Sequence, residues 1–312
     1  MNRRFTIVGL FGLLATLWGF SFLAISLGLE SLEPVLFAAY RYDVAAVLLL
    51  GYALFSDSAW RPTDITNASA ILAGGLFLVG ANAFLFIGQQ TVSSGVAAIL
   101  QSLLPIMTSL WALRLLPEER VSAVGTIGIV LGFVGVSLII RPDPANLLGS
   151  NVTGRLLILI QITGVALGGV LIQRVGPTLD KAALSGWSMF TGGLFLHAVS
   201  LSLGETFSFP TTVKSGAAVA YLGIFATAIA FLIYFTLLDV RGAFETSLVS
   251  YLVPIVATIV GVVVLGESIT TLTIAGFMIV FAGFILLKRQ AIANIVNGAT
   301  EYEENTSGQL RD

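Results

Sequence analysis

Apolar residues run in long stretches along this chain, separated by short segments that hold turn residues or charges, such as Glu30–Pro34 and Asp57–Asp64. A helix needs about 20 apolar residues to cross the hydrocarbon core of a bilayer. We therefore predict about ten membrane-spanning helices. The predicted spans are Phe5–Leu27, Pro34–Phe55, Ser69–Gln89, Ser94–Leu116, Val121–Ile140, Leu156–Gln173, Ala182–Leu203, Ser215–Leu237, Ala243–Leu265 and Thr270–Leu287.

Composition supports a membrane protein and excludes several other classes. Hydrophobic residues make up 56% of the 312 residues and charged residues 10%, against roughly 25% charged in soluble domains. A soluble fold of this length has no core large enough to bury so much apolar surface. The net charge of −2 gives no indication of nucleic-acid binding. The chain has no cysteine, which excludes disulfides, thiolate metal sites and thiol catalysis.

An embedded enzyme is not expected. The chain has one histidine, no HExxH motif and no lysine inside a predicted span, so the usual groups for metal-dependent or Ser/Lys hydrolysis are missing from the sequence. We predict no cofactor and no metal site.

Basic residues indicate the orientation in a cell membrane. With the N-terminus inside, ten basic residues fall in cytoplasmic segments and three in external ones, a strong positive-inside bias. The external three are Arg141, Arg155 and Lys214. Both termini are then cytoplasmic in a multi-pass plasma-membrane protein. The first apolar run, about 23 residues long, exceeds the apolar core of a signal peptide and is interpreted as a retained helix.

The chain contains an internal repeat. Pro105, in Leu-Leu-Pro-Ile, and Pro254, in Leu-Val-Pro-Ile, are 149 positions apart. Gly128 and Gly135 correspond to Gly276 and Gly283 at a spacing of 148. We predict one five-helix repeat at 1–150, a second at 151–290, and an acidic, disordered cytoplasmic tail at 291–312. Because five is odd, the second repeat enters the membrane from the opposite side, an architecture of secondary transporters with a binding site near the midplane.

The motifs carried by the two repeats resemble the drug/metabolite transporter superfamily, in its EamA-type branch. They are Trp18-Gly19-Phe20-Ser21-Phe22, Pro34 with Arg41, Ser94-Gly95 with Pro105 and Glu119-Arg120, Gly223-Ile224-Phe225-Ala226-Thr227-Ala228, and Gly242-Ala243 with Pro254 and Leu265-Gly266-Glu267. The second repeat departs from the pattern because it lacks the Trp-Gly pair and the arginine of the second helix. The resemblance implies ten helices around a central cavity and the export, or less often the import, of amino acids or related metabolites.

Small and polar residues recur on one face of the fourth and ninth predicted helices and are candidates for the cavity wall. An alternative is that the small residues only let helices pack closely. A proline inside a helix frees a backbone carbonyl, which is tolerated where it is buried in protein or lines water. The cavity candidates are Trp18, Asn82, Phe86, Gln101, Pro105, Tyr234, Ser250, Tyr251 and Pro254.

Ionisable residues in or near the spans give further candidates. Arg41 needs a partner, expected to be Glu30, Glu33 or an unpaired carbonyl. It serves a structural or gating ion pair, contacts an anionic substrate group, or extends to the membrane interface. Glu245 near the start of the ninth helix satisfies the helix dipole or titrates at the cytoplasmic mouth.

The remaining ionisable groups are assigned simpler roles. Glu119 and Glu267 are interpreted as solvated loop acids, and His197 as a packed or interfacial residue.

These features together predict a secondary transporter that moves a small, amino-acid-like metabolite by alternating access. A passive facilitator or channel is the alternative. The expected partners are the solute and the bilayer, with protons as a candidate coupling ion and no nucleic acid. The sequence contains no signal for an oligomeric state.

Overall fold

The computed structural model describes residues 3–56, 59–116, 122–140 and 150–289, and within these ranges the chain forms helices and loops without strands. Glu119 and the predicted tail at 291–312 lie outside the described residues. The first repeat contributes α1 (Arg3–Gly28), α2 (Pro34–Phe55), α3 (Ile65–Ala73), η1 (Gly74–Val79), α4 (Asn82–Gln89), α5 (Ser94–Gln101), α6 (Leu104–Leu115) and α7 (Ala123–Ile140). The second contributes α8 (Ser150–Val175), α9 (Lys181–Ser202), α10 (Val213–Ala220), η2 (Tyr221–Ile229), α11 (Ala230–Ser247), α12 (Val249–Leu265) and α13 (Thr271–Leu287).

Seven helical segments of the described chain are long and apolar enough to cross a membrane, and α12 and α13 are shorter apolar helices. The helix α9 is of similar length but less apolar, because it contains several Ser, Thr and Gly residues and His197. The prediction of an all-α membrane protein is confirmed. Helix starts follow local chemistry: Pro34 occupies the first turn of α2, and the side chains of Asp180 and Thr270 accept hydrogen bonds from the first-turn amides of α9 and α13.

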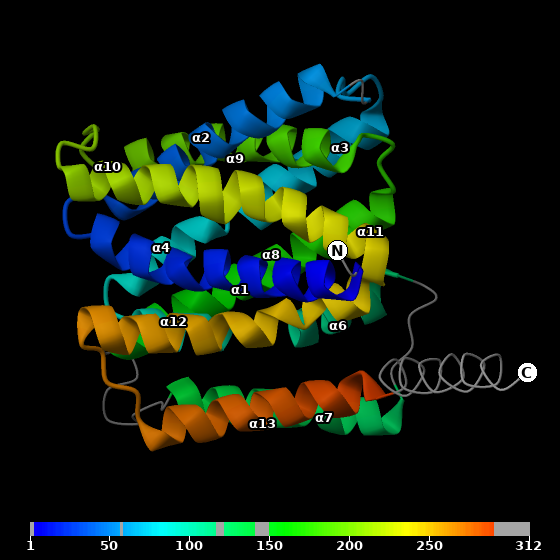
Figure 1. Ribbon diagram of the computed structural model, residues 1–312, viewed down its shortest axis with the longest axis vertical. Helices are drawn as coiled ribbons and strands as arrows, with labels where there is room; N and C mark the ends of the chain where they lie inside the picture. The colour runs from blue at the N-terminus through cyan, green and yellow to red at the C-terminus, as the bar shows by residue number, and fades with distance from the viewer. Residues whose placement is uncertain (1–2, 57–58, 117–121, 141–149, 290–312) are drawn as a thin grey trace, which may run out of the picture.

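Helices run back and forth across the bundle, so that the loops gather at two ends (Figure 1). The helix α1 ends, and α2, α5, α8 and α10 begin, at the left end in Figure 1. The distribution of basic residues predicts that this end faces outward. It is called the predicted external end below, and the opposite end is the predicted cytoplasmic end.

Three of the long spans are interrupted rather than regular. The third span contains the π-helical segment η1 between α3 and α4, and the eighth contains η2 between α10 and α11. The fourth span breaks at Ser102 and Leu103, and Pro105 lies in the first turn of the new helix α6, where its missing N–H is not needed. Its counterpart Pro254 lies inside the continuous helix α12. The two prolines therefore have different local consequences despite the repeat.

The helices α7 and α13 pack as an antiparallel pair at one end of the long axis (Figure 1). A Cβ on Gly128 would collide with the carbonyl oxygen of Gly283, and a Cβ on Gly135 would lie 2.6 Å from that of Gly276. Since Gly128 corresponds to Gly276, and Gly135 to Gly283, the two contacts are exchanged by a pseudo-twofold axis. This is the contact pattern that an inverted repeat produces.

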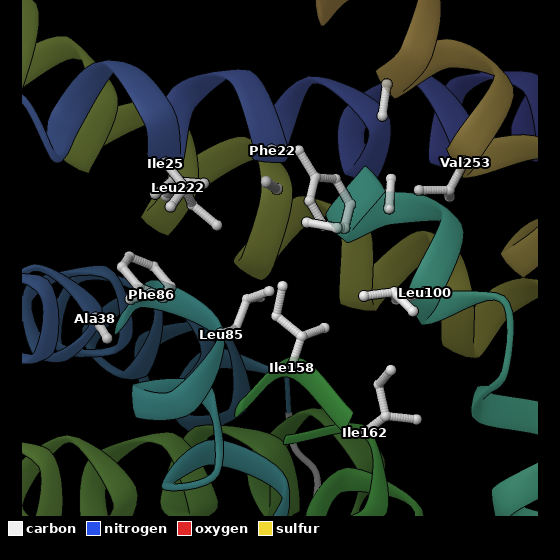
Figure 2. Close-up of a cluster of buried hydrophobic side chains, with 14 of the residues drawn as sticks. Phe22, Ile25, Ala38, Leu85, Phe86, Leu100, Ile158, Ile162, Leu222 and Val253 are labelled. Atoms are coloured by element: carbon white, nitrogen blue, oxygen red, sulfur yellow. The ribbon is translucent and has the colours of Figure 1, made fainter. Parts of the chain in front are cut away.

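Apolar side chains from both repeats fill the centre of the bundle (Figure 2). Phe22 and Ile25 of α1 approach Leu222 of η2 and Val253 of α12, while Ile158 of α8 projects from the opposite side. Phe86 is fully buried and contacts the ring of Phe37 edge-on, with 5.2 Å between the ring centroids. The core extends along the bundle, from Phe22 and Phe86 toward the predicted external end to Leu49 and Leu237 toward the other.

Candidate functional site

Glu267, in the loop between α12 and α13, caps the start of α5. Its carboxylate accepts hydrogen bonds from the backbone N–H of Ser94 (2.8 Å), the hydroxyl of Ser94 (2.8 Å) and the backbone N–H of Gly95 (3.2 Å). A carboxylate at this position neutralises the positive end of the helix dipole. The expectation of a solvated loop acid is therefore wrong, because two unpaired amides of α5 lie beside this carboxylate and Gly261 leaves room for it.

Glu205 caps α2 in the same way. Its two carboxylate oxygens accept hydrogen bonds from the backbone N–H groups of Val35 (3.0 Å) and Leu36 (2.8 Å). The loop that carries Glu205 also covers Tyr40, whose hydroxyl donates to the carbonyl of Ser208 at 3.0 Å. Both caps come from the second repeat, both capped helices belong to the first, and both contacts lie at the predicted external end.

The small faces of α5 and α12 contact one another near this end. A Cβ on Gly261 would lie 2.6 Å from the hydroxyl oxygen of Ser94, and a Cβ on Gly95 would lie 3.3 Å from that of Thr258. In this part of the bundle, the small residues serve close packing between the helices.

Two amides meet farther along the same helix. The Nε2 of Gln101 donates to the Oε1 of Gln161 on α8 at 2.6 Å. Gln161 is 3% exposed, so this bond joins the two repeats through a buried polar contact. Gln101 was predicted from the sequence as a cavity residue, but Gln161 was not. A polar amide inside the sixth predicted span could have indicated Gln161, because such a side chain needs a partner within the protein.

Trp18 and Tyr234 are also brought together. Their ring centroids are 5.8 Å apart, and both rings lie within 6.4 Å of that of Phe231. The indole N–H of Trp18 donates to the carbonyl of Ala226, inside the π-helical segment η2, at 3.1 Å. Such wide turns are frequent at functional sites. All three rings are partly exposed where they pack against the core.

The other cavity candidates lie elsewhere or have partners of their own. Asn82 donates to the carbonyl of Leu78 in its own segment at 2.8 Å, and Phe86 belongs to the apolar core. Tyr251 packs against Phe281 and Phe284 of α13. These contacts place Tyr251 against α13 and not beside Trp18 or Gln101. The candidates Ser250 and Pro254 also lie on α12, close to Tyr251 in the sequence.

Arg41 is buried between α2 and η2. It is 8% exposed, its Nε donates to the hydroxyl of Thr227 at 2.8 Å, and its guanidinium carbon lies 5.2 Å from the ring centroid of Tyr42. Neither expected acid is its partner: Glu30 of the preceding loop pairs with Lys214, and in the described residues no carboxylate lies within salt-bridge range of Arg41. The expected gating ion pair with Glu30 or Glu33 is absent there, because the side chain turns inward toward η2.

Asp43 and His197 form a pair that sequence reasoning missed. The Nε2 of His197 on α9 lies 2.8 Å from the Oδ2 of Asp43 on α2. The two residues are 154 positions apart and belong to different repeats, so no local spacing could have revealed them. His197 is therefore a hydrogen-bonded partner of an acid as well as a packed residue.

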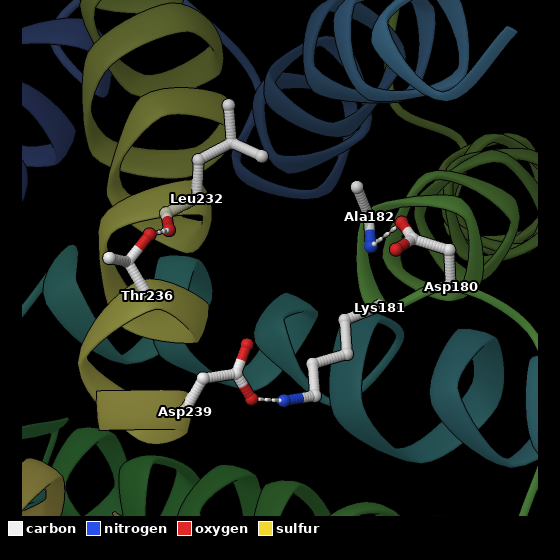
Figure 3. Close-up of polar contacts among 6 residues, drawn as sticks. All are labelled: Asp180, Lys181, Ala182, Leu232, Thr236 and Asp239. Carbon is white, nitrogen blue, oxygen red and sulfur yellow. Dashed lines mark hydrogen bonds and ion pairs between the residues drawn. The ribbon is translucent and has the colours of Figure 1, made fainter. Parts of the chain in front are cut away.

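At the predicted cytoplasmic end, Lys181 of α9 forms an ion pair with Asp239 of α11 (Figure 3). The neighbouring Asp180 caps α9 through the N–H of Ala182 at 2.9 Å. Glu245 belongs to the helix α11, but its side chain lies outside the described part of the chain.

A groove of about 240 Å³ runs between α1 and α10 and is lined by apolar residues such as Phe20 and Leu27, with Lys214 and Tyr221 at its edge. It contains none of the predicted site residues. Among the side chains that the structure describes, no cluster of three or more His, Cys, Asp or Glu residues is arranged to hold a metal ion.

Residues 6–141 and 152–289 each match the EamA-like transporter family. The chain belongs to the EamA-like transporter family. It is similar to an "Uncharacterized transporter" of Archaeoglobus fulgidus, at 27% identity over 89% of this chain and 97% of the relative. It is also similar to the "Uncharacterized inner membrane transporter YedA" of Escherichia coli K12, at 30% identity over 88% of this chain and 89% of the relative.

A solved structure described as "Crystal structure of protein" shares the fold. Its TM-score is 0.65 and its sequence identity 19%, and the match covers 92% of this chain and 98% of that chain. The two family matches confirm the resemblance to the EamA branch, and the protein is a multi-pass membrane transporter.

Proposed function

We propose that this protein is a secondary transporter that exports a small, amino-acid-like metabolite across the cell membrane by alternating access, with both termini in the cytoplasm. The observation that carries the proposal is the match of both halves to a transporter family. The symmetric contact of α7 with α13 supports an inverted repeat, in which two related halves rock about a central site.

The interior supplies groups suited to a solute with a carboxylate and an apolar body. Arg41 has five N–H donors, and a single hydrogen bond from it, to Thr227, is described. A buried cation with few partners stabilises an anionic group. The amides of Gln101 and Gln161 and the rings of Trp18 and Tyr234 provide the few polar contacts within a mostly apolar wall that small-solute sites require.

In this proposal, the structure represents a state that is closed at the predicted external end. The caps made by Glu205 and Glu267 and the core around Phe22, Phe86 and Ile158 all lie toward that end. The rings around Trp18, by contrast, are partly exposed. In this proposal, the solute enters from the cytoplasm, and the two caps separate when the protein opens outward.

Counterflow in proteoliposomes tests the function. Vesicles loaded with an unlabelled mixture of the standard amino acids receive the same mixture in radiolabelled form, and label should accumulate transiently inside. The variant Arg41→Gln should abolish accumulation while Arg174→Gln, at an exposed position in the last turn of α8, leaves it intact. A carrier exchanges label for unlabelled solute, whereas a channel only equilibrates it. Absence of counterflow for the whole mixture would exclude an amino-acid exporter.

A further inference from the structure

Asp43 and His197 join α2 of the first repeat to α9 of the second within the membrane-spanning part of the bundle. The Nε2–Oδ2 distance is 2.8 Å, and the exposed fractions of the two side chains are 27% for His197 and 43% for Asp43. Gly193, one turn before His197, makes room for the acid, because a Cβ there would lie 2.9 Å from the Oδ1 of Asp43. The acid and the base are thus held together on a partly exposed surface.

The depth of this pair makes its charge state important. Asp43 is nine residues into α2, which at about 1.5 Å per residue places it roughly 13 Å below the predicted external end of that helix. His197 lies five residues before the end of α9, roughly 8 Å from the same end of the bundle. The hydrocarbon core is about 30 Å thick, so the pair lies within the spans, in the half toward the predicted external end. An ionised carboxylate at that depth is unfavourable, and an ionisable residue there marks a functional site by default.

We propose that Asp43 and His197 together form a proton-binding site that couples proton movement to transport. With Asp43 ionised and His197 neutral, the pair carries one net negative charge. One proton from water makes it neutral and is held on the axis between Nε2 and Oδ2. When the proton leaves, it returns to water and the negative charge is restored, so no other reactant is needed.

Few other charges act on this pair. On α2 itself, Tyr40 contacts the His197 ring at 6.0 Å between centroids, and Arg41 points to the other side, toward Thr227. The span Ile65–Gln89, which packs against both helices, contains no charged residue. The remaining titratable groups on the packed segments are Glu205, Lys214 and Tyr221 toward the predicted external end, and Tyr234, Asp239, Arg241 and Glu245 on α11.

The helix α2 connects the pair to the interior. Its residue Arg41 bonds to η2 two positions before Asp43, and its first turn is capped by Glu205. A change in the attraction between α2 and α9 therefore acts on a helix that also carries the candidate anion-binding group. This coupling role rests on the proposed transport function, whereas proton binding by the pair does not.

Nuclear magnetic resonance tests proton binding without any solute. Because His197 is the chain's single histidine, ¹⁵N-histidine labelling in nanodiscs reports one imidazole, whose signals are followed against pH. The variant Asp43→Asn should move the midpoint of this titration, since Oδ2 of Asp43 lies 2.8 Å from Nε2 of His197. The matched control Asp239→Asn should leave it unchanged. An unchanged midpoint in Asp43→Asn would overturn the site.

Transport in proteoliposomes tests the coupling. Uptake of the radiolabelled amino-acid mixture is measured with an imposed pH gradient and, separately, as counterflow without one. In Asp43→Asn and His197→Gln, the ratio of gradient-driven uptake to counterflow should fall at least tenfold, whereas Asp239→Asn keeps the wild-type ratio. A wild-type ratio in both site variants would refute the coupling. Absence of counterflow in the wild-type protein would instead refute the proposed function, and the imidazole titration would still decide whether the pair binds a proton.

Discussion

Replacing Glu267 with glutamine should favour opening at the predicted external end. In the wild-type protein, the carboxylate bridges the loop after α12 and the first turn of α5 through hydrogen bonds of 2.8, 2.8 and 3.2 Å. Glutamine retains one acceptor oxygen but places an NH₂ group against N–H donors. The change therefore removes a charge-assisted contact that exists only while the two repeats are together.

The size of the effect follows from these contacts. Hydrogen bonds to a charged partner contribute about 1.5–3 kcal/mol, and loss of a helix cap costs about 0.5–2 kcal/mol. We take about 2 kcal/mol for the substitution, because one acceptor remains. Since about 1.4 kcal/mol changes an equilibrium tenfold, the population of the open state should rise about 30-fold.

Thiol labelling measures this population. Ala97, which is fully buried one turn into α5, is replaced with cysteine, and a membrane-impermeant maleimide is added to intact cells. The natural chain has no cysteine, so the signal is specific. Glu267→Gln should accelerate labelling about 30-fold, whereas Asp180→Asn, which weakens a cap at the opposite end, should not. Acceleration below about threefold in a folded variant would refute the interpretation of Glu267 as a latch.

Three other changes give separate tests. Gln101→Leu leaves the buried Oε1 of Gln161 without its described donor. The loss is on the order of 1–3 kcal/mol, so counterflow should fall roughly 5- to 150-fold. Near-normal counterflow would show that the amide pair lies off the solute path. Gly128→Ala forces a Cβ against α13 and should lower the thermal midpoint measured by tryptophan fluorescence, whereas Gly12→Ala, with open space around it, should not. A single cysteine at Lys214 should react with an impermeant reagent added outside intact cells, and reaction only after lysis would invert the proposed topology.

The span pattern could be predicted because hydrophobic length is a local property. The bounds of α2, Pro34–Phe55, agree with the apolar run, and α13 differs from its prediction by one residue. The π-helical segments η1 and η2 were not predicted, since one extra residue in a turn leaves hydropathy unchanged. The break before Pro105 could not be distinguished from the continuous helix around Pro254 either, because tertiary contacts decide between them.

The site was less predictable because its contacts join distant residues. Repeat spacing identified Gln101 and helix composition identified Arg41, but their partners Gln161 and Thr227 come from the other repeat. Glu267 was interpreted as a solvated acid because it lies in a loop of the sequence. Only the folded chain places the first turn of α5 beside its carboxylate.

The two caps also order the events of biosynthesis. Both α2 and α5 leave the ribosome long before Glu205 and Glu267 have been made, so the first half enters the membrane with two helix starts still unpaired. A first half produced alone never acquires the carboxylates of Glu205 and Glu267 that accept hydrogen bonds from these helix starts. The first repeat should thus remain susceptible to degradation until the second repeat has been inserted and packed against it. Co-expression of the two halves as separate chains should reduce the degradation of the first half.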